Sequence, residues 1–374
     1  MPQNDRLVKA FEHPQALGSF RSWLKLLRQN PEIDLSFLPR ILVVSFFSLL
    51  TSPLRIYERL RYDALLQRTP VHPAPLFIIG HWRTGTTHLQ NLLSQDPNLS
   101  YLSTFQAMTP GFCLTGNGPL KKILGWITNR LYLTRLIDNI PLKMDAPQEE
   151  EYALANLTPY SFLHMFSFPR QAQEIFERYV LFKNLPPHEL AEWEQTYLQV
   201  LRKNSLMING NRPVLKNPAH SGRLSTVLRL FPEGKFIHLY RNPYHVYLST
   251  RRLYQVVLPR SQLQQIDMAQ VDSYILSFYT QLMHKFLADK ALIPIENLIE
   301  VRFEALESAP LEQLERIYRV LDLPGFEQAQ PDIQKYLDTI VAYQKNEYNL
   351  TQEVIDKVNQ HWGFAFDEWG YKML

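Results

Sequence analysis

The sequence contains a single cysteine, Cys113, so an internal disulfide framework is excluded and a reducing compartment is favoured. Its formal net charge is only +3 over 374 residues, too small to predict nucleic acid as the main partner. No apolar stretch closely follows the first residues, so no secretory signal is predicted. We therefore expect a cytoplasmic protein.

Long hydrophobic runs are also lacking, and the most apolar segment extends from Ile41 to Leu50. This run is about half of the roughly 20 residues that a membrane-spanning helix needs, so we do not expect a transmembrane helix. Two interpretations stay open. The segment is either a buried helix of the soluble fold or an interfacial helix, in which case residues 36–62 make a peripheral membrane contact.

Short apolar runs separated by helical patterns predict the fold class. Strands are expected within residues 76–80, 213–218, 234–240 and 298–306, each rich in β-branched, aromatic or leucine residues. Such an alternation predicts an α/β fold with a mainly parallel sheet flanked by many helices. We expect a helical N-terminal extension over residues 1–70, packed on a main domain over residues 71–374.

The first of these strands leads into an incomplete phosphate-binding loop, G-H-W-R-T-G-T-T from Gly80 to Thr87. Thr86 stands where the Walker A lysine would be, and Arg83 supplies a cation two residues before Gly85. A helix is expected to follow, so the amides of Gly85, Thr86, Thr87 and His88 would face an anion at its N-terminus. The missing lysine argues against an ordinary nucleoside triphosphatase.

A second anion site is predicted after the strand at residues 234–240. Arg241 ends that strand, Asn242 is a candidate N-cap with Pro243 at the first helical position, and Ser249 lies about two turns along the helix. An arginine fork with a nearby hydroxyl is a suitable receptor for a separate phosphate.

Together, "FIIGHWRTGTTHLQNLL" and "YRNPYHVYLS" resemble the sulfotransferases that use 3′-phosphoadenosine-5′-phosphosulfate (PAPS), over residues 75–370 or so. The chain is closest to the broad bacterial group, and "VRFEALESAPLEQLERIYRVLDL" is similar to the family's late strand–helix segment. The resemblance implies that Arg83, Thr84 and the following loop bind the 5′-phosphosulfate. It also implies that Arg241 and Ser249 bind the 3′-phosphate, and that transfer proceeds in line without a metal.

The resemblance implies further roles. Lys216 matches a lysine that contacts the transferring group, and Lys345 lies near a basic segment over the 3′-phosphate. For the general base that deprotonates the acceptor, Glu150 is slightly preferred to His220. Glu149 and Glu151 flank Glu150 in "APQEEEY", and such a run is typical of a solvated helix start.

Two other functions stay open: an ATP-dependent P-loop kinase, and a non-catalytic protein of the same fold that binds nucleotide or membrane. The sequence leaves the acceptor open as well, either a small molecule or a lipid-like one, because one fold hosts many substrates. It also leaves the oligomeric state open. No metal site is expected, because the histidines are scattered and the lone cysteine has no CxxC partner.

Overall fold

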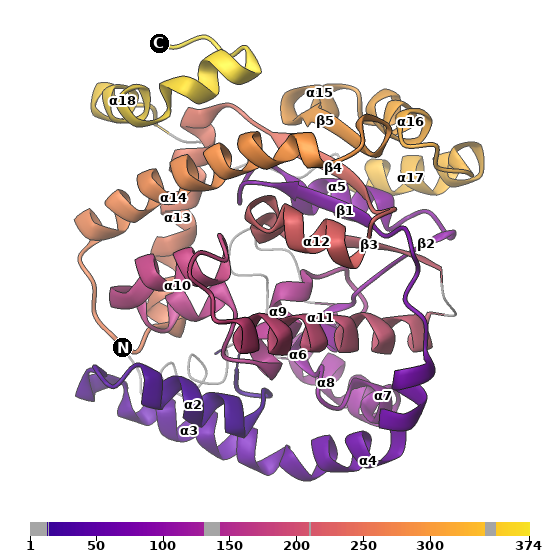
Figure 1. Ribbon diagram of the computed structural model, residues 1–374, viewed down its shortest axis with the longest axis vertical. Coiled ribbons are helices and arrows are strands. Elements are labelled where there is room, and N and C mark those ends of the chain that lie inside the picture. The colour runs from indigo at the N-terminus through magenta and orange to yellow at the C-terminus, as the bar shows by residue number, and fades with distance from the viewer. Residues whose placement is uncertain (1–12, 14, 131–142, 209–210, 341–348) are drawn as a thin grey trace. The chain divides into compact units, whose positions relative to one another are not determined.

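The computed structural model describes residues 13, 15–130, 143–208, 211–340 and 349–374, which form two compact units (Figure 1). Unit 1 comprises residues 1–71, 102–210 and 253–267, and unit 2 comprises residues 72–101, 211–252 and 268–374. The predicted division at residue 70 stays a prediction.

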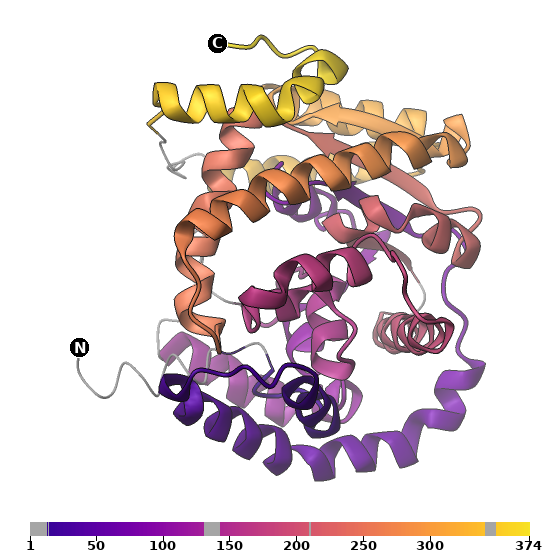
Figure 2. The ribbon, with the colours of Figure 1, turned by 60° about the vertical axis from the view of Figure 1, so that its left-hand side comes forward.

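Unit 1 is helical. Its α-helices are α2 (Phe20–Gln29), α3 (Leu38–Leu50), α4 (Ser52–Arg68), α6 (Thr104–Met108), α7 (Cys113–Gly116), α8 (Pro119–Arg130), α9 (Glu150–Leu157), α10 (Ala172–Tyr179) and α11 (Pro187–Met207). Short 3₁₀ helices are η1 (Leu35–Phe37), η2 (Phe162–Phe166) and η3 (Pro169–Gln171). Figure 1 and Figure 2 show α3 and α4 following one another along the outer border of this unit.

Unit 2 contains a five-stranded parallel sheet of order β2-β3-β1-β4-β5. This confirms the predicted fold class, an α/β fold with a mainly parallel sheet. The strands are β1 (Leu76–Gly80), β2 (Leu99–Tyr101), β3 (Arg212–Lys216), β4 (Lys235–Tyr240) and β5 (Leu298–Arg302). Four strands match the expected segments. The short edge strand β2 was not expected, because three residues that include Ser100 carry no apolar run or alternation.

Helices cover both faces of this sheet. The α-helices are α5 (Thr86–Leu93), α12 (Leu224–Leu230), α13 (Pro243–Ser261, which begins in unit 2), α14 (Met268–Asp289), α15 (Phe303–Ser308), α16 (Pro310–Val320), α17 (Phe326–Ile340) and α18 (Gln352–Trp369). The 3₁₀ helices are η4 (Pro218–Gly222), η5 (Lys290–Leu292) and η6 (Ile295–Asn297).

The side chains of β1 alternate between two cores, as successive residues of a strand must. Leu76 and Ile78 belong to a buried cluster with leucines of α5 and apolar residues of α15 to α17. Phe77 points to the other face, where its ring stacks on Phe236 at 5.0 Å and meets Phe231 at 5.8 Å. Because both faces are covered, all five residues of the central strand β1 are buried.

Candidate functional site

Three neighbouring strands of unit 2 end at one edge of the sheet. From central β1 the sheet continues to β3 on one side and to β4 on the other, and all three are parallel. Such a switch point at the carboxyl ends of strands is where open α/β sheets bind ligands. Lys216 is the last residue of β3, while Arg83 and Arg241 follow the ends of β1 and β4. The fold therefore brings three cationic residues that were predicted to bind the donor to the same edge of the sheet.

The loop between β1 and α5 has a geometry that requires glycine at two positions. Gly80 has φ +136°, and a Cβ there would lie 2.3 Å from the Leu239 carbonyl oxygen. Gly85 has φ +97°, and its Cβ would lie 2.1 Å from the Phe303 ring. Thr84 closes the turn through a 2.8 Å hydrogen bond from its Oγ1 to the His81 carbonyl. Both glycines therefore fix the path of the loop.

Arg83 itself has a left-handed backbone, with φ 74°, which is uncommon for a residue other than glycine. Its Nε donates a 2.9 Å hydrogen bond to Oγ of Ser249 on α13. Nη1 of Arg241 donates to the Arg83 carbonyl at 3.3 Å. Residues that are 166 and 158 positions from Arg83 in sequence thus meet at this loop, and backbone strain of this kind is concentrated at functional sites.

The turn after β4 is held from α15, which sequence reasoning assigned no role. The Arg241 guanidinium lies over the Phe303 ring, 4.4 Å from its centre. Glu304 accepts hydrogen bonds from the Asn242 amide (3.1 Å) and from the Tyr371 hydroxyl (2.6 Å). Both residues lie in the segment "VRFEALESAPLEQLERIYRVLDL", which the sequence suggested as a strand–helix segment without a role for either residue.

The predicted N-cap of α13 is confirmed, because Oδ1 of Asn242 accepts a 3.0 Å hydrogen bond from the Tyr244 amide. At the start of α5, Thr86 is buried and Thr87 is half-buried. The His88 amide, however, donates to the Gly85 carbonyl at 2.9 Å. Of the four amides expected to face an anion, this one is engaged within the helix. The expectation that the loop amides face an anion stays a prediction.

The segment after β3 places Lys216 and His220 in buried positions. Lys216 is 1% exposed and lies opposite Ile78 in the sheet register. Asn217 begins η4 by accepting a 3.1 Å hydrogen bond from the Ala219 amide. The His220 ring is fully buried and meets the Phe77 ring edge-on at 5.9 Å. Lys216 is therefore a buried cation and not a solvated surface lysine.

The acidic run at the start of α9 lies in unit 1. The sequence predicted that its side chains are solvated, and this is wrong for two of them. Both Glu150 and Glu151 are fully buried at the start of α9. Glu151 accepts hydrogen bonds from the Ser161 hydroxyl (2.7 Å) and the Phe162 amide (3.3 Å). The Tyr197 hydroxyl donates to Glu150 at 3.4 Å. Burial of two carboxylates at a helix N-terminus is supported by these donors and by the dipole.

Lys345 lies outside the described residues. Among the residues that the structure describes, no group of three or more His, Cys, Asp or Glu side chains could hold a metal ion. The Cys113 thiol is buried, and burial raises its pKa to about 12.

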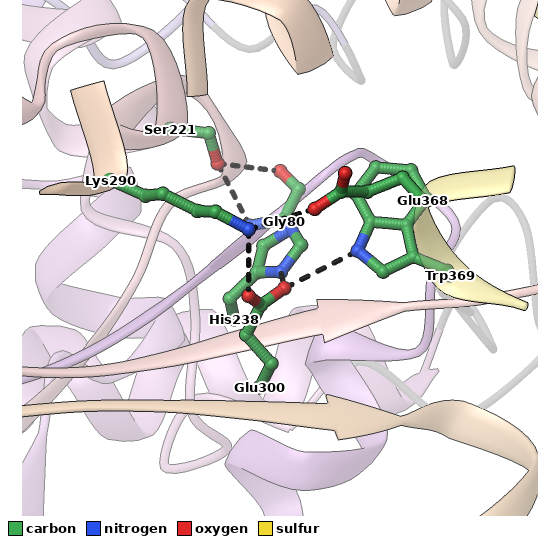
Figure 3. Close-up of polar contacts among 7 residues, drawn as sticks. All are labelled: Gly80, Ser221, His238, Lys290, Glu300, Glu368 and Trp369. Carbon is green, nitrogen blue, oxygen red and sulfur yellow. Dashed lines mark hydrogen bonds and ion pairs between the residues drawn. The ribbon is translucent and has the colours of Figure 1, made fainter. Parts of the chain in front are cut away.

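A polar network supports β4 from the side of β5 (Figure 3). Nδ1 of the buried His238 lies 3.0 Å from the Glu300 carboxylate, which also accepts from Lys290 (3.2 Å) and from the Trp369 indole (3.3 Å). Burial alone would raise the pKa of Glu300, but the hydrogen bond from His238 and the charge of Lys290 outweigh it and hold the pKa at about 2. This network fixes the strand that leads to Arg241.

The same figure shows a second support, at the end of β1 (Figure 3). The Ser221 hydroxyl donates to the Gly80 carbonyl at 2.9 Å and accepts from the Gly80 amide at 2.8 Å. Ser221 therefore holds both the amide and the carbonyl of Gly80, the last residue of β1 before the loop.

Comparison with known proteins identifies the class. Residues 75–328 match the sulfotransferase family, more than half of the chain, so the protein belongs to that family and has its α/β fold. Two curated relatives, each named omega-hydroxy-beta-dihydromenaquinone-9 sulfotransferase Stf3, come from Mycobacterium bovis and Mycobacterium tuberculosis. Each is 30% identical over 355 residues, which cover 94% of this chain and 90% of the relative.

Two solved structures share the fold. Sulfotransferase STF9 from Mycobacterium avium is 20% identical with a TM-score of 0.71, covering 99% of this chain and 97% of its own. Sulfotransferase STF1 from Mycobacterium tuberculosis H37Rv is 16% identical with a TM-score of 0.67, covering 97% and 99%. The match over residues 75–328 confirms, at the level of the family, the resemblance predicted from two short motifs.

Proposed function

We propose that the protein transfers a sulfuryl group from PAPS to an acceptor hydroxyl, or to an amine. The observation that carries this proposal is the contact between the two predicted anion sites, in which Arg83 bonds to Ser249 and Arg241 bonds to the Arg83 carbonyl. A donor with phosphate or sulfate at both its 5′ and 3′ positions needs cations from two separate motifs. Family membership supports the same reaction class.

The residues present fit such a donor. Arg83, Thr84, Gly85, Thr86 and Thr87 would hold the 5′-phosphosulfate, at the amino end of α5, where the helix dipole favours an anion. When bound, PAPS supplies an activated sulfuryl group whose bridging oxygen gains negative charge during transfer. His88 follows this loop and remains a proposed neighbour of the nucleotide.

Arg241 and Ser249 would bind the 3′-phosphate. Ser249 accepts its hydrogen bond from Arg83, which leaves its hydroxyl hydrogen to donate to a phosphate oxygen. Lys345 is a further proposed cation over this phosphate. A fork of guanidinium donors beside a hydroxyl distinguishes a nucleotide with a 3′-phosphate from ATP.

Two further groups would act on the transfer itself. Lys216, buried at the end of β3, would neutralise charge on the transferring group together with Arg83, so positively charged side chains do what Mg²⁺ does in a Walker site. Glu150 or His220 would accept the proton of the acceptor as general base.

We further propose a lipid-like acceptor with a hydroxyl group, in a cytoplasmic enzyme. The support is the activity for which the two mycobacterial relatives are named, the sulfation of a hydroxylated menaquinone. Because the relatives are 30% identical to this chain, we propose a class of acceptor, a hydroxyl group on a long apolar molecule, and not one compound.

Calorimetric titration without added metal tests the donor. Wild type should bind 3′,5′-ADP more tightly than 5′-ADP or ATP. Arg241→Ala should weaken 3′,5′-ADP binding about 100-fold, because it removes one or two charge-assisted hydrogen bonds, and should leave 5′-ADP nearly unchanged. The control Arg319→Ala, at an exposed position at the end of α16, should bind as wild type does. Equal binding of all three nucleotides, or ATP binding only with Mg²⁺, would overturn the proposal.

A further inference from the structure

The helices α3 and α4 expose many large apolar side chains of unit 1. Leu60 is 84% exposed, Leu42 is 69% exposed and Phe46 is 60% exposed. We call the whole set, together with Leu35 of the preceding η1, the apolar face: Leu35, Leu38, Leu42, Phe46, Leu49, Leu50, Leu54, Ile56, Tyr57, Leu60 and Leu65. The interpretation of residues 41–50 as a buried helix is therefore wrong, because composition alone does not tell which side of a helix the protein covers.

The opposite side of the same two helices is anchored to unit 1. Val44, Ser48, Glu58 and Leu66 are buried at intervals of helical spacing. Glu58 forms a buried ion pair with Lys203 of α11, with Nζ and Oε1 2.6 Å apart. Its other oxygen accepts a 2.8 Å hydrogen bond from the Thr115 amide. One side of α3 and α4 therefore packs on unit 1, and the other side leaves the apolar face exposed.

One helical segment, Leu35–Arg68, is long and apolar enough to cross a membrane by length and composition, and only 11% of its most apolar window is buried. Crossing a bilayer would, however, break the ion pair between Glu58 and Lys203 and leave charges unpaired in hydrocarbon. A helix pair that keeps one side on the protein can instead lie in the plane of a membrane surface.

The charges around the apolar face favour a lipid surface over a second copy of the chain. Arg59, Arg61 and Arg68 are exposed on α4. The acids of that helix offset them only in part, because Glu58 is buried against Lys203 and Asp63 is paired with Arg59 at 3.3 Å. Two such faces would bring excess positive charge together, whereas anionic lipid headgroups complement it. Tyr57 is 55% exposed, and tyrosine is enriched at the interface between a membrane and water.

We propose that the apolar face is a membrane-docking surface that inserts between the headgroups of an anionic bilayer. Its purpose rests on the proposed function, because a lipid-like acceptor is concentrated in the membrane and docking would bring the enzyme to it. The docking itself needs only the exposed side chains and arginines described above.

Vesicle co-sedimentation tests the proposal with the full chain. Wild type should pellet with vesicles of phosphatidylcholine and phosphatidylglycerol at low salt, and less at high salt or with phosphatidylcholine alone. The triple variant Leu42→Gln/Phe46→Gln/Leu60→Gln should partition at least about 100-fold more weakly, since each buried apolar side chain contributes about tenfold. Arg61→Gln/Arg68→Gln should weaken binding to anionic vesicles about fivefold for each charge removed.

A matched control removes three exposed apolar side chains of unit 2 instead, Leu292→Gln/Ile295→Gln/Val320→Gln, and should pellet as wild type does. Urea unfolding checks that every variant is folded, and calorimetric binding of 3′,5′-ADP is measured beside it. If wild type does not pellet, or if both triple variants lose binding equally, the proposal is wrong.

Sedimentation velocity tests the other possible occupant of the apolar face, a second copy of the chain. A wild-type dimer that the first triple variant converts to monomer, with no vesicle binding, would assign the face to a second copy and overturn the proposal. Failure to bind 3′,5′-ADP in every chain would instead contradict the proposed donor, while vesicle binding would still support docking.

Discussion

Adding one methyl group at Gly85 should disrupt the phosphate loop. The residue has φ +97° and ψ 10°, in the left-handed region that L-residues rarely adopt. A Cβ built there lies 2.1 Å and 2.3 Å from Cδ2 and Cε2 of Phe303, which is buried and lies under the Arg241 guanidinium. Gly85→Ala therefore combines backbone strain with a steric overlap that a small rotation of the ring cannot relieve.

The two effects have separate magnitudes. The left-handed backbone costs an alanine about 1–2 kcal/mol. Forcing an extra methyl group into a packed core costs about 1–3 kcal/mol more. We expect Gly85→Ala to lower the free energy of unfolding by about 2–5 kcal/mol. By contrast, Gly363→Ala in α18 meets no atom within 4 Å and should be neutral or stabilising by up to about 1 kcal/mol.

A double-mutant cycle in urea separates the two effects. Phe303→Val removes both ring atoms that the new Cβ would meet, so the double variant Gly85→Ala/Phe303→Val should be more stable than the sum of the single changes by about 1–3 kcal/mol. The strain at φ +97° should remain. The reasoning is refuted if Gly85→Ala unfolds within about 0.5 kcal/mol of wild type, or if the two changes are additive.

Two further predictions concern stability. The pKa of Glu300 is lowered from 4.5 to about 2, so its ionised form stabilises the fold fully above about pH 5, and this contribution is lost as the pH falls toward 2. Glu300→Gln should be about 1–3 kcal/mol less stable at pH 7, and the deficit in urea unfolding should shrink by about 1 kcal/mol at pH 4; a deficit independent of pH would contradict this assignment. Lys203→Met should cost about 3–5 kcal/mol, because it leaves Glu58 charged, buried and without its cation. Urea unfolding should show Glu58→Gln/Lys203→Met to be more stable than Lys203→Met alone, and equal stabilities would argue that the ion pair is unimportant.

The fold class and four of the five strands could be predicted because buried parallel strands are short, apolar and bounded by turn residues. β2 could not, since Leu99–Tyr101 is recognised only by its pairing with β3. The exposure of α3 could not be predicted either. A run such as residues 41–50 has apolar residues on every side, and the contacts that choose its buried side come from distant segments.

For the candidate site, the sequence predicted the cationic residues, but not what holds them. The 2.9 Å bond between Arg83 and Ser249 joins residues 166 positions apart, and no local pattern encodes such a pairing. Phe303 and Glu304 were missed as supports because each contacts a loop that is distant in sequence, at Gly85 and at Asn242. The buried state of Glu150 was likewise invisible in a run of three acids.

The missing Walker lysine has a structural consequence. A lysine in the first turn of α5 would be positioned by that helix alone. Here the cation is Arg83, whose guanidinium is bonded to Ser249 of α13 and whose carbonyl accepts from Arg241 at the end of β4. The groups proposed for the 5′ and 3′ ends of the donor therefore share one set of contacts, so a shift of either segment alters both. Under the proposed function, recognition of the two ends of the donor is therefore coupled through the protein.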